Sequence, residues 1–208
     1  ASNTFEIGSD LQKEKSNQAE LGLHFHGGVV EGKVAVYYNR YKNFIYLADT
    51  GEIEDDLPVR IWSQNDAKFR GAEAETTFHL AQGGTSGNWD LRVFGDTVRA
   101  TLTDGGGNLP RIPAGRVGST LSWSADSLRA NVGAVRYMKQ DKVAAFETDT
   151  AGYTLVNAHF AWTFVNDERS QWEAFVDGNN RADQTARPAT WLFKDVAPLP
   201  GRNVSVGV

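Results

Sequence analysis

The chain has 208 residues, of which 40% are hydrophobic and 23% charged, and no stretch looks like a linker between two domains. The net charge of −5 argues against a nucleic-acid-binding protein, and the absence of cysteine excludes disulfides and thiolate metal sites. No apolar run reaches the roughly 18 residues that a transmembrane helix needs. The 21 glycines and the 11% of aromatic residues favour an all-β architecture instead.

Residues 16–47 are predicted to form a long β-hairpin around a tight, glycine-bearing turn. In its first strand Leu21, Leu23 and Phe25 alternate with polar or small residues. This period of two is expected for a sheet with one apolar and one polar face. The second strand, over 33–47, is longer than the five or six residues that are usual in soluble proteins. It suits a tilted strand that crosses a membrane, which needs roughly nine to eleven.

Two segments that flank this hairpin are predicted to be loops. Residues 1–15 are polar, and residues 48–60 (ADTGEIEDDLPVR) are interpreted as a long, acidic connection. Its carboxylates are the candidates for binding a cationic substrate, and they are Glu52, Glu54, Asp55 and Asp56. Such a cluster raises the local concentration of cations. A solvated loop without a ligand explains the same residues and is the favoured alternative.

The rest of the chain repeats the alternating pattern in seven further segments, so about nine strands are expected. The segments are predicted over 61–80, from 89, 116–124, from 128, 153–164, from 172 and 202–208. Long connections are expected at 104–115, 139–152 and 179–201, and the remaining turns are short. Outer-membrane barrels show this asymmetry, because their periplasmic turns are short and their extracellular loops long.

Aromatic residues on the apolar face gather beside the short turns. They are Phe25, Phe78, Trp89, Trp123, Trp162, Phe164 and Trp172. A row of aromatic rings at one level suits the boundary between lipid and water. A soluble sandwich would place such rings mid-strand, in its core, and the general preference of Trp for strands is a competing explanation. The row predicts that the short turns face the periplasm and the long connections face outward.

Several stretches resemble the C-terminal part of a TonB-dependent outer-membrane receptor, and the branch of zinc-uptake receptors is the most similar. The stretches are TFEIGSDLQKEKSNQAELGL, YNRYKNFIYL, FRGAEAE, NLPRIPAGR, GYTLVNAHFAW and FKDVAPLPGRNVSVGV. The resemblance implies a 22-stranded barrel in the Gram-negative outer membrane, filled by an N-terminal plug and opened by TonB. The sequence holds neither plug nor TonB-contacting motif, and the aromatic residue that ends family members does not follow Val208. Residues 1–208 are therefore expected to be an incomplete, antiparallel arc of that transmembrane β-barrel.

The histidines are the first candidates for a metal site, because zinc accepts histidine nitrogen. His24, His26 and His79 are expected on the polar face beside short turns, and His159 in the lower half of its strand. No further ligand can be placed beside them, so packing or hydrogen bonding to the plug is the favoured role. The charged residues of the polar face are expected to pair with one another or with the plug. They are Glu20, Glu73, Glu75, Asp90, Arg92, Asp96, Arg129 and Glu173.

The predicted function is TonB-driven uptake of a scarce metal or metal chelate, with zinc favoured and haem or a siderophore left open. The expected partners are the plug of the same chain, TonB, outer-membrane lipid and the small substrate, with no nucleic acid and no cofactor. The sequence shows no nucleophile-elbow motif, and an enzyme is not expected. Two alternatives remain. One is a soluble β-sandwich that binds a ligand through its long loops, and the other is a small, self-contained barrel with an enzymatic or adhesive role.

Overall fold

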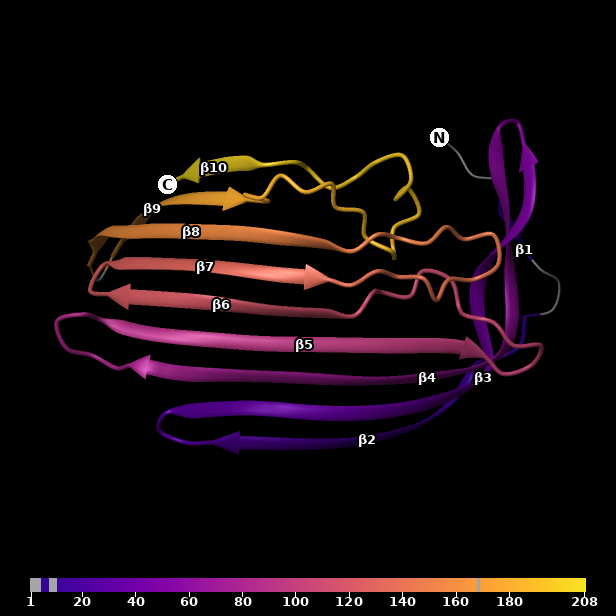
Figure 1. The fold of residues 1–208 in the computed structure, drawn as a ribbon, viewed down its shortest axis with the longest axis horizontal. Coiled ribbons are helices and arrows are strands. Elements are labelled where there is room, and N and C mark those ends of the chain that lie inside the picture. The colour runs from indigo at the N-terminus through magenta and orange to yellow at the C-terminus, as the bar shows by residue number, and fades with distance from the viewer. Residues whose placement is uncertain (1–4, 8–10, 168) are drawn as a thin grey trace.

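Nine antiparallel strands form one continuous sheet (Figure 1). The structure, a computed structural model, describes residues 5–7, 11–167 and 169–208. The strands are β2 (Lys15–His26), β3 (Val30–Glu54), β4 (Leu57–Ala81), β5 (Asn88–Leu102), β6 (Arg116–Ala125), β7 (Leu128–Tyr137), β8 (Tyr153–Asn166), β9 (Gln171–Asn179) and β10 (Asn203–Gly207). Each pairs with the next along the chain, from β2 at one edge to β10 at the other. The described residues contain no helix, and hence none of the length and apolarity that crossing a membrane requires.

The predicted all-β, antiparallel architecture is confirmed, and the β-sandwich alternative is wrong. The described strands form a single sheet and not two sheets packed face to face. Its large apolar side chains are accordingly not buried in a shared core, since Leu21 is 75% exposed and Leu23 66%. Within the described residues, β2 and β10 do not pair with each other, so these strands do not close into a small barrel either.

The polar N-terminal segment contains a short strand where only a loop was predicted. This strand, β1 (Phe5–Ile7), pairs in parallel with residues 60–62 of β4. β4 is long enough to leave a free edge there, because its pairing with β5 begins only at Ala67. An unpaired edge readily takes up another strand. The remainder of the predicted loop up to residue 10 lies outside the described residues.

The region predicted as a long acidic loop is the tip of the β3–β4 hairpin, so that prediction is wrong. β3 continues to Glu54 and β4 begins at Leu57. The two turn residues, Asp55 and Asp56, have positive φ angles of 49° and 62°. Two successive residues with positive φ make the tight turn that matches the twist of a hairpin. The turn was not predicted from the sequence, because Asp-Asp is a weaker turn signal than Asn-Gly, and the four acidic residues were interpreted as a loop.

The β3–β4 hairpin bends where it leaves the sheet, and its outer part lies across the end of the sheet that carries the long loops (Figure 1). The pairing shifts between Tyr41 and Phe44, and Asn43 between them has a φ of +58°. A bulge of this kind bends a strand and changes the direction of the residues beyond it. The rings of Tyr41, Phe44 and Phe69 pack edge-on at 5.1–5.2 Å around the bend. They cover the buried side chains of Ala100 and Leu109.

The sheet has an apolar face and a polar face, as the alternation predicted. On the apolar face the register aligns Val132 with Leu121 and Ala158 of the neighbouring strands. On the polar face Arg116 Nε lies 2.7 Å from Asp96 Oδ2. Two further ion pairs on that face join Arg92 to Glu75 and Arg129 to Glu173. The predicted pairing among the polar-face charges is thus confirmed for these residues.

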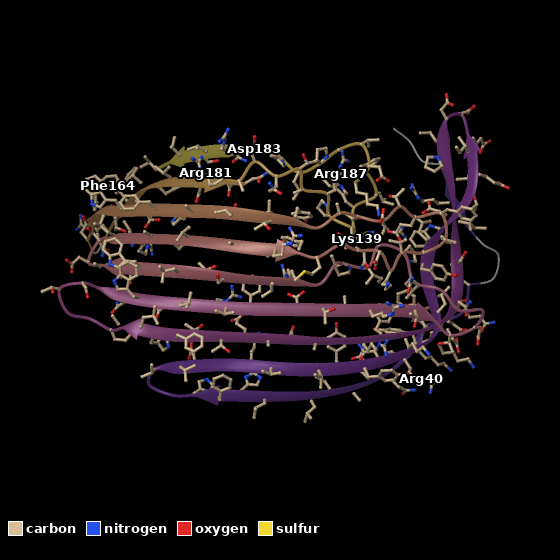
Figure 2. The ribbon with its side chains drawn as sticks, viewed as in Figure 1. Arg40, Lys139, Phe164, Arg181, Asp183 and Arg187 are labelled. Atoms are coloured by element: carbon tan, nitrogen blue, oxygen red, sulfur yellow. The ribbon has the colours of Figure 1, made fainter. Side chains whose placement is uncertain are left out.

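Aromatic rings line the apolar face at the end of the sheet that carries the short turns, called here the short-turn end. Trp89 and Trp123 have ring centroids 6.2 Å apart, and Trp162 and Phe164 have centroids 5.5 Å apart. Figure 2 labels Phe164 at this end, opposite the long-loop end. The predicted row of aromatic residues beside the short turns is therefore present.

Gly71 in β4 provides a close approach that no larger residue allows. A Cβ at this position would lie 2.6 Å from the carbonyl oxygen of Thr97 and against the ring of Tyr37. We expect Gly71→Ala to lower the free energy of unfolding of the full-length protein by about 1–3 kcal/mol, because overpacking forces backbone shifts. A urea titration measures this. Gly22→Ala is the control, since its nearest atom lies 3.9 Å away; equal losses in both variants would contradict the explanation.

Candidate functional site

Four segments that are far apart in sequence meet at the long-loop end. They are the outer part of the β3–β4 hairpin and the loops 103–115, 138–152 and 180–202. The hairpin contacts the first loop through Arg111, whose Nη2 donates to the carbonyl oxygen of Leu47 at 2.7 Å. It contacts the second loop at Gly51, which lies beneath the ring of Phe146. The bend in the hairpin is what brings these contacts within reach.

A cavity of about 370 Å³ lies between the hairpin and these loops. Its lining combines buried charges with apolar and aromatic side chains. The lining residues are Asp49, Gly51, Glu52, Ile53, Pro58, Val59, Arg60, Arg111, Phe146, Glu147, Thr148, Trp191, Leu192, Lys194 and Asp195. Concave sites of this size, with apolar walls and a few placed polar groups, are the usual form of a small-molecule site.

Two buried ion pairs form part of the cavity wall. Arg60 Nε lies 2.5 Å from Asp49 Oδ1 across the hairpin, and the two side chains are 11% and 13% exposed. Lys194 Nζ lies 3.6 Å from Glu147 Oε1, and these side chains are only 6% and 8% exposed. Ions this deeply buried persist only when further hydrogen bonds satisfy them.

The Glu147 carboxylate and the Lys194 ammonium are both satisfied by further hydrogen bonds. Glu147 accepts from the backbone N–H of Arg111 at 3.1 Å and of Ala144 at 3.2 Å. Lys194 donates to the carbonyl oxygen of Thr148, and its Nζ lies 3.4 Å from Thr150 Oγ1. This one pair therefore ties together all three loops that close the cavity.

Arg111 holds the loop 103–115 against the hairpin. Its backbone takes the left-handed conformation, with φ at +57°. Burial lowers the pKa of its guanidinium, and the carboxylates of Asp49 and Glu147 act in the opposite direction. Because the ordinary pKa of arginine lies far above neutrality, the group stays charged. It contributes a fixed positive charge to the cavity.

The apolar part of the cavity lining, called here the aromatic wall, is open to solvent. Phe146 is 71% exposed and Ile53 is 74% exposed, values that are unusual for side chains of this size. Trp191 and Leu192 of the loop 180–202 also belong to this part of the lining. Exposed aromatic side chains beside fixed charges can bind a small molecule that is both flat and polar.

A second cavity, of about 290 Å³, lies between the polar face of the sheet and the loop 180–202. The ion pair of Asp96 and Arg116 lies at its base. The rings of Tyr137 and Tyr153 stack beside it with centroids 4.7 Å apart. Arg187, labelled in Figure 2, lines it from the loop. The loop 180–202 therefore contributes to both cavities, with residues 187–190 lining this one and Trp191, Leu192, Lys194 and Asp195 lining the outer one.

The structure places the predicted acidic candidates on the hairpin. Glu52 lines the outer cavity. Glu54, Asp55 and Asp56 are exposed at the tip and are not among the lining residues. Only one of the four carboxylates is therefore placed to contact a molecule in that cavity, and a binding role for the others stays a prediction.

The structure places the predicted histidines on the polar face beside short turns. The register sets His24 opposite Lys33 and His26 opposite Glu31. His79 Nδ1 lies 2.7 Å from Asp90 Oδ1. His159 makes the same kind of contact, at 2.7 Å, with Asp177. Among the residues that the structure describes, no three His, Cys, Asp or Glu side chains gather closely enough to hold a metal ion.

Sequence reasoning missed the charged residues that shape the outer cavity. Arg60 lies in β4, whereas Arg111, Glu147 and Lys194 lie in three separate loops. No spacing rule links these residues in the sequence. A signal did exist, because Arg111 falls in NLPRIPAGR and Lys194 in FKDVAPLPGR. Both stretches carry the family resemblance although they lie in irregular loops, where sequence is ordinarily variable.

Several solved structures share this fold over nearly the whole chain. The copper transporter OprC superposes with a TM-score of 0.80 at 16% identity, over 94% of this chain and 31% of OprC. The FrpB iron transporter from Neisseria meningitidis gives 0.70 at 13% identity, over 97% and 32%. The siderophore receptor PirA from Acinetobacter baumannii gives 0.65 at 17% identity, over 95% and 31%. The chain therefore spans about a third of the length of these structures.

The family comparison covers most of the chain. Residues 1–180 match the family described as TonB dependent receptor-like, beta-barrel. The match includes the bent hairpin and two of the loops that line the outer cavity, and it agrees with the sheet of consecutive hairpins. Barrels of this family are outer-membrane proteins of Gram-negative bacteria. The chain belongs to the β-barrel family of the TonB-dependent receptors.

Proposed function

We propose that residues 1–208 form the C-terminal part of a TonB-dependent receptor that imports a small metal chelate across the Gram-negative outer membrane. The observation that carries the proposal is the cavity at the long-loop end, closed by four segments above a polar sheet face. The short turns with their aromatic rings face the periplasm, and the cavity faces outward. An N-terminal plug of the same chain and TonB are the proposed partners, and outer-membrane lipid covers the apolar face.

The chemistry of the outer cavity favours a chelate over a bare ion. Zinc prefers histidine and thiolate ligands, and the lining residues include neither. The carboxylates of Asp49 and Glu147 already pair with Arg60 and Lys194. The aromatic wall instead suits the organic part of a metal complex. The copper, iron and siderophore transporters named above are compatible with such a substrate, and a zinc chelate stays within this class.

Uptake by whole cells tests the proposal. We expect cells with the full-length gene to accumulate one of three radiolabelled substrates, a zinc chelate, a copper chelate or a ferric siderophore, under limitation for that metal. Accumulation is expected to disappear when the gene or TonB is deleted. Equal accumulation of all three substrates with and without the gene would overturn the proposal, as would recovery of the protein in the soluble fraction.

Removing the aromatic wall should weaken binding of that substrate. We expect Phe146→Ala with Trp191→Ala to raise the dissociation constant at least tenfold, because large aromatic side chains dominate small contact surfaces. Binding is measured on the purified full-length receptor. Trp172→Ala, which removes an exposed ring at the short-turn end, is the control and should leave affinity unchanged. Equal weakening by both would argue against binding at the outer cavity.

A further inference from the structure

The segment 11–14, just before β2, lies against the bend of the β3–β4 hairpin, where the side chain of Gln64 in β4 binds it. Gln64 Oε1 accepts from the backbone N–H of Gln12 at 2.8 Å, and Gln64 Nε2 donates to the carbonyl oxygen of Gln12 at 2.6 Å. The side-chain amide thus binds this backbone through one donor and one acceptor, as a neighbouring strand would. The same Nε2 donates to the carbonyl oxygen of Asn43 in the bulge, at 2.7 Å. One side chain therefore joins the segment 11–14 to the bulge.

Two further hydrogen bonds join the segment 11–14 to the bulge. A bulge interrupts the ladder and leaves backbone groups that need other partners. The backbone N–H of Ile45 donates to Glu14 Oε1 at 2.6 Å, and Asn43 Nδ2 donates to Gln12 Oε1 at 3.3 Å. Together these residues are called the hairpin clamp, which consists of Gln12, Glu14, Asn43 and Gln64. The clamp joins residues that lie up to 52 positions apart in sequence.

The clamp lies at the place where the outer part of the hairpin loses the support of the sheet. β2 pairs with β3 only as far as Lys42, and β5 pairs with β4 only from Ala67. Beyond these residues, in the part of the chain that the structure describes, β1 is the one strand that pairs with the hairpin, at residues 60–62 of β4. The direction of the outer part therefore depends on contacts at the bend. This outer part carries Asp49 and Arg60, which line the outer cavity.

The chemistry of the clamp requires an amide at residue 64. Its side chain must accept from one N–H and donate to two carbonyl oxygens, and among side chains with this reach only glutamine carries both an acceptor and two N–H donors. Leucine of similar size would remove all three hydrogen bonds. An ionised glutamate would keep the acceptor but lose the donors. These two substitutions at Gln64 therefore separate the amide from the bulk of the side chain.

We propose that Gln64 is a positioning residue for substrate binding, which holds the outer part of the hairpin, through the clamp, in the orientation that completes the outer cavity. The inference rests on the proposed function, because it concerns affinity for the imported chelate. Gln64 is not among the residues that line the cavity, so it acts through the hairpin. If the hairpin also takes other orientations, only the fraction with a complete cavity binds, and the observed dissociation constant rises in inverse proportion to that fraction.

Gln64→Leu in the purified full-length receptor tests the clamp. Loss of three hydrogen bonds is expected to speed amide hydrogen exchange in 44–54 and 57–63 about tenfold, and to raise the dissociation constant of the imported chelate about tenfold. Exchange in β6 and β7 should stay unchanged, because the clamp does not contact these strands. Gln18→Leu is the matched control. Gln18 in β2 makes a single side-chain contact, at 3.5 Å to the hydroxyl of Tyr41, and its loss should change neither quantity.

Gln64→Glu gives a readout that a general loss of stability would not produce. The ionised carboxylate has no hydrogen to donate to the carbonyl oxygens of Gln12 and Asn43, and protonation returns one donor. These oxygens and the neighbouring carboxylates of Glu14 and Asp66 favour the protonated form, so we expect the pKa of the introduced group above the ordinary value of about 4.3. The dissociation constant of Gln64→Glu relative to wild type should therefore fall between about pH 8 and about pH 5. Glu14 and Asp66 are present in both proteins, so this ratio isolates the introduced group.

The outcomes distinguish this inference from the proposed function. Unchanged exchange in Gln64→Leu would overturn the inference, as would equal effects in Gln18→Leu or a Gln64→Glu ratio that does not depend on pH. Faster exchange with unchanged affinity would also overturn it, since the clamp would then hold the hairpin without positioning it for substrate. Exchange is measured without substrate, so it decides whether the clamp exists whatever the chain imports. A wild-type receptor that binds none of the three chelates overturns the proposed function, and the positioning role with it, even where the exchange result holds.

Discussion

Val132→Arg is expected to destabilise the full-length receptor in a bilayer by about 2–4 kcal/mol, the usual cost of a cation on the lipid face near the bilayer midplane. Val132 lies midway along β7 and is 49% exposed on the apolar face. Its neighbours across the sheet, Leu121 and Ala158, offer no partner for a charge. The free energy of unfolding is measured by urea titration of receptor refolded into lipid vesicles.

Asn131→Arg is the matched control for this substitution. Asn131 precedes Val132 in the same strand and lies on the polar face, between Ser122 and His159. The same cation is there surrounded by polar groups, so we expect little change in stability. A loss of stability in Asn131→Arg that equals the loss in Val132→Arg would mean that the apolar face does not contact lipid. The pair therefore tests the orientation on which the outward position of the outer cavity depends.

Most of the fold could be predicted from the sequence because one physical rule governs most of it. Alternation of apolar and polar residues identifies strands and assigns their faces, and Val132 and Asn131 fall on the faces that alternation gives them. The errors lie where the backbone leaves this rule. The bulge at Asn43 and the turn at Asp55 and Asp56 need positive φ angles that their sequence signals only weakly. Because of the bulge and the tight turn, the region expected to be a loop is the outer part of a hairpin.

The candidate site was largely unpredictable from the sequence, because it is assembled by tertiary contacts. Glu52 was the one predicted candidate that lines the outer cavity. Lys194 reaches Glu147 across 47 residues of chain, and its role depends on burial that no local pattern reveals. The histidines were candidates for a metal site only because of their side-chain chemistry. In the structure His79 and His159 each lie 2.7 Å from a carboxylate oxygen on the polar face.

Lys194→Met is expected to open the outer loops. It leaves the Glu147 carboxylate, only 8% exposed, without its cation. Removing one partner of a buried ion pair costs about 3–5 kcal/mol. We expect that cost as faster amide hydrogen exchange in 138–152 and 180–202, by at least a hundredfold. Substrate affinity should fall with it, since these loops carry Phe146 and Trp191.

Two variants separate the buried pair from a general effect of losing a lysine. Lys139 and Asp149 form an exposed ion pair within the loop 138–152. Lys139 Nζ lies 2.7 Å from Asp149 Oδ2, which is closer than Lys194 lies to Glu147, but both side chains are 57% exposed. Burial rather than distance decides the energy of an ion pair, so Lys139→Met should leave exchange unchanged. In the double variant E147Q/K194M no uncompensated charge remains, so part of the protection against amide hydrogen exchange should return. Equal exchange in Lys139→Met and Lys194→Met would show that the pair does not hold the loops, and that closure rests on the apolar contacts of Phe146 instead.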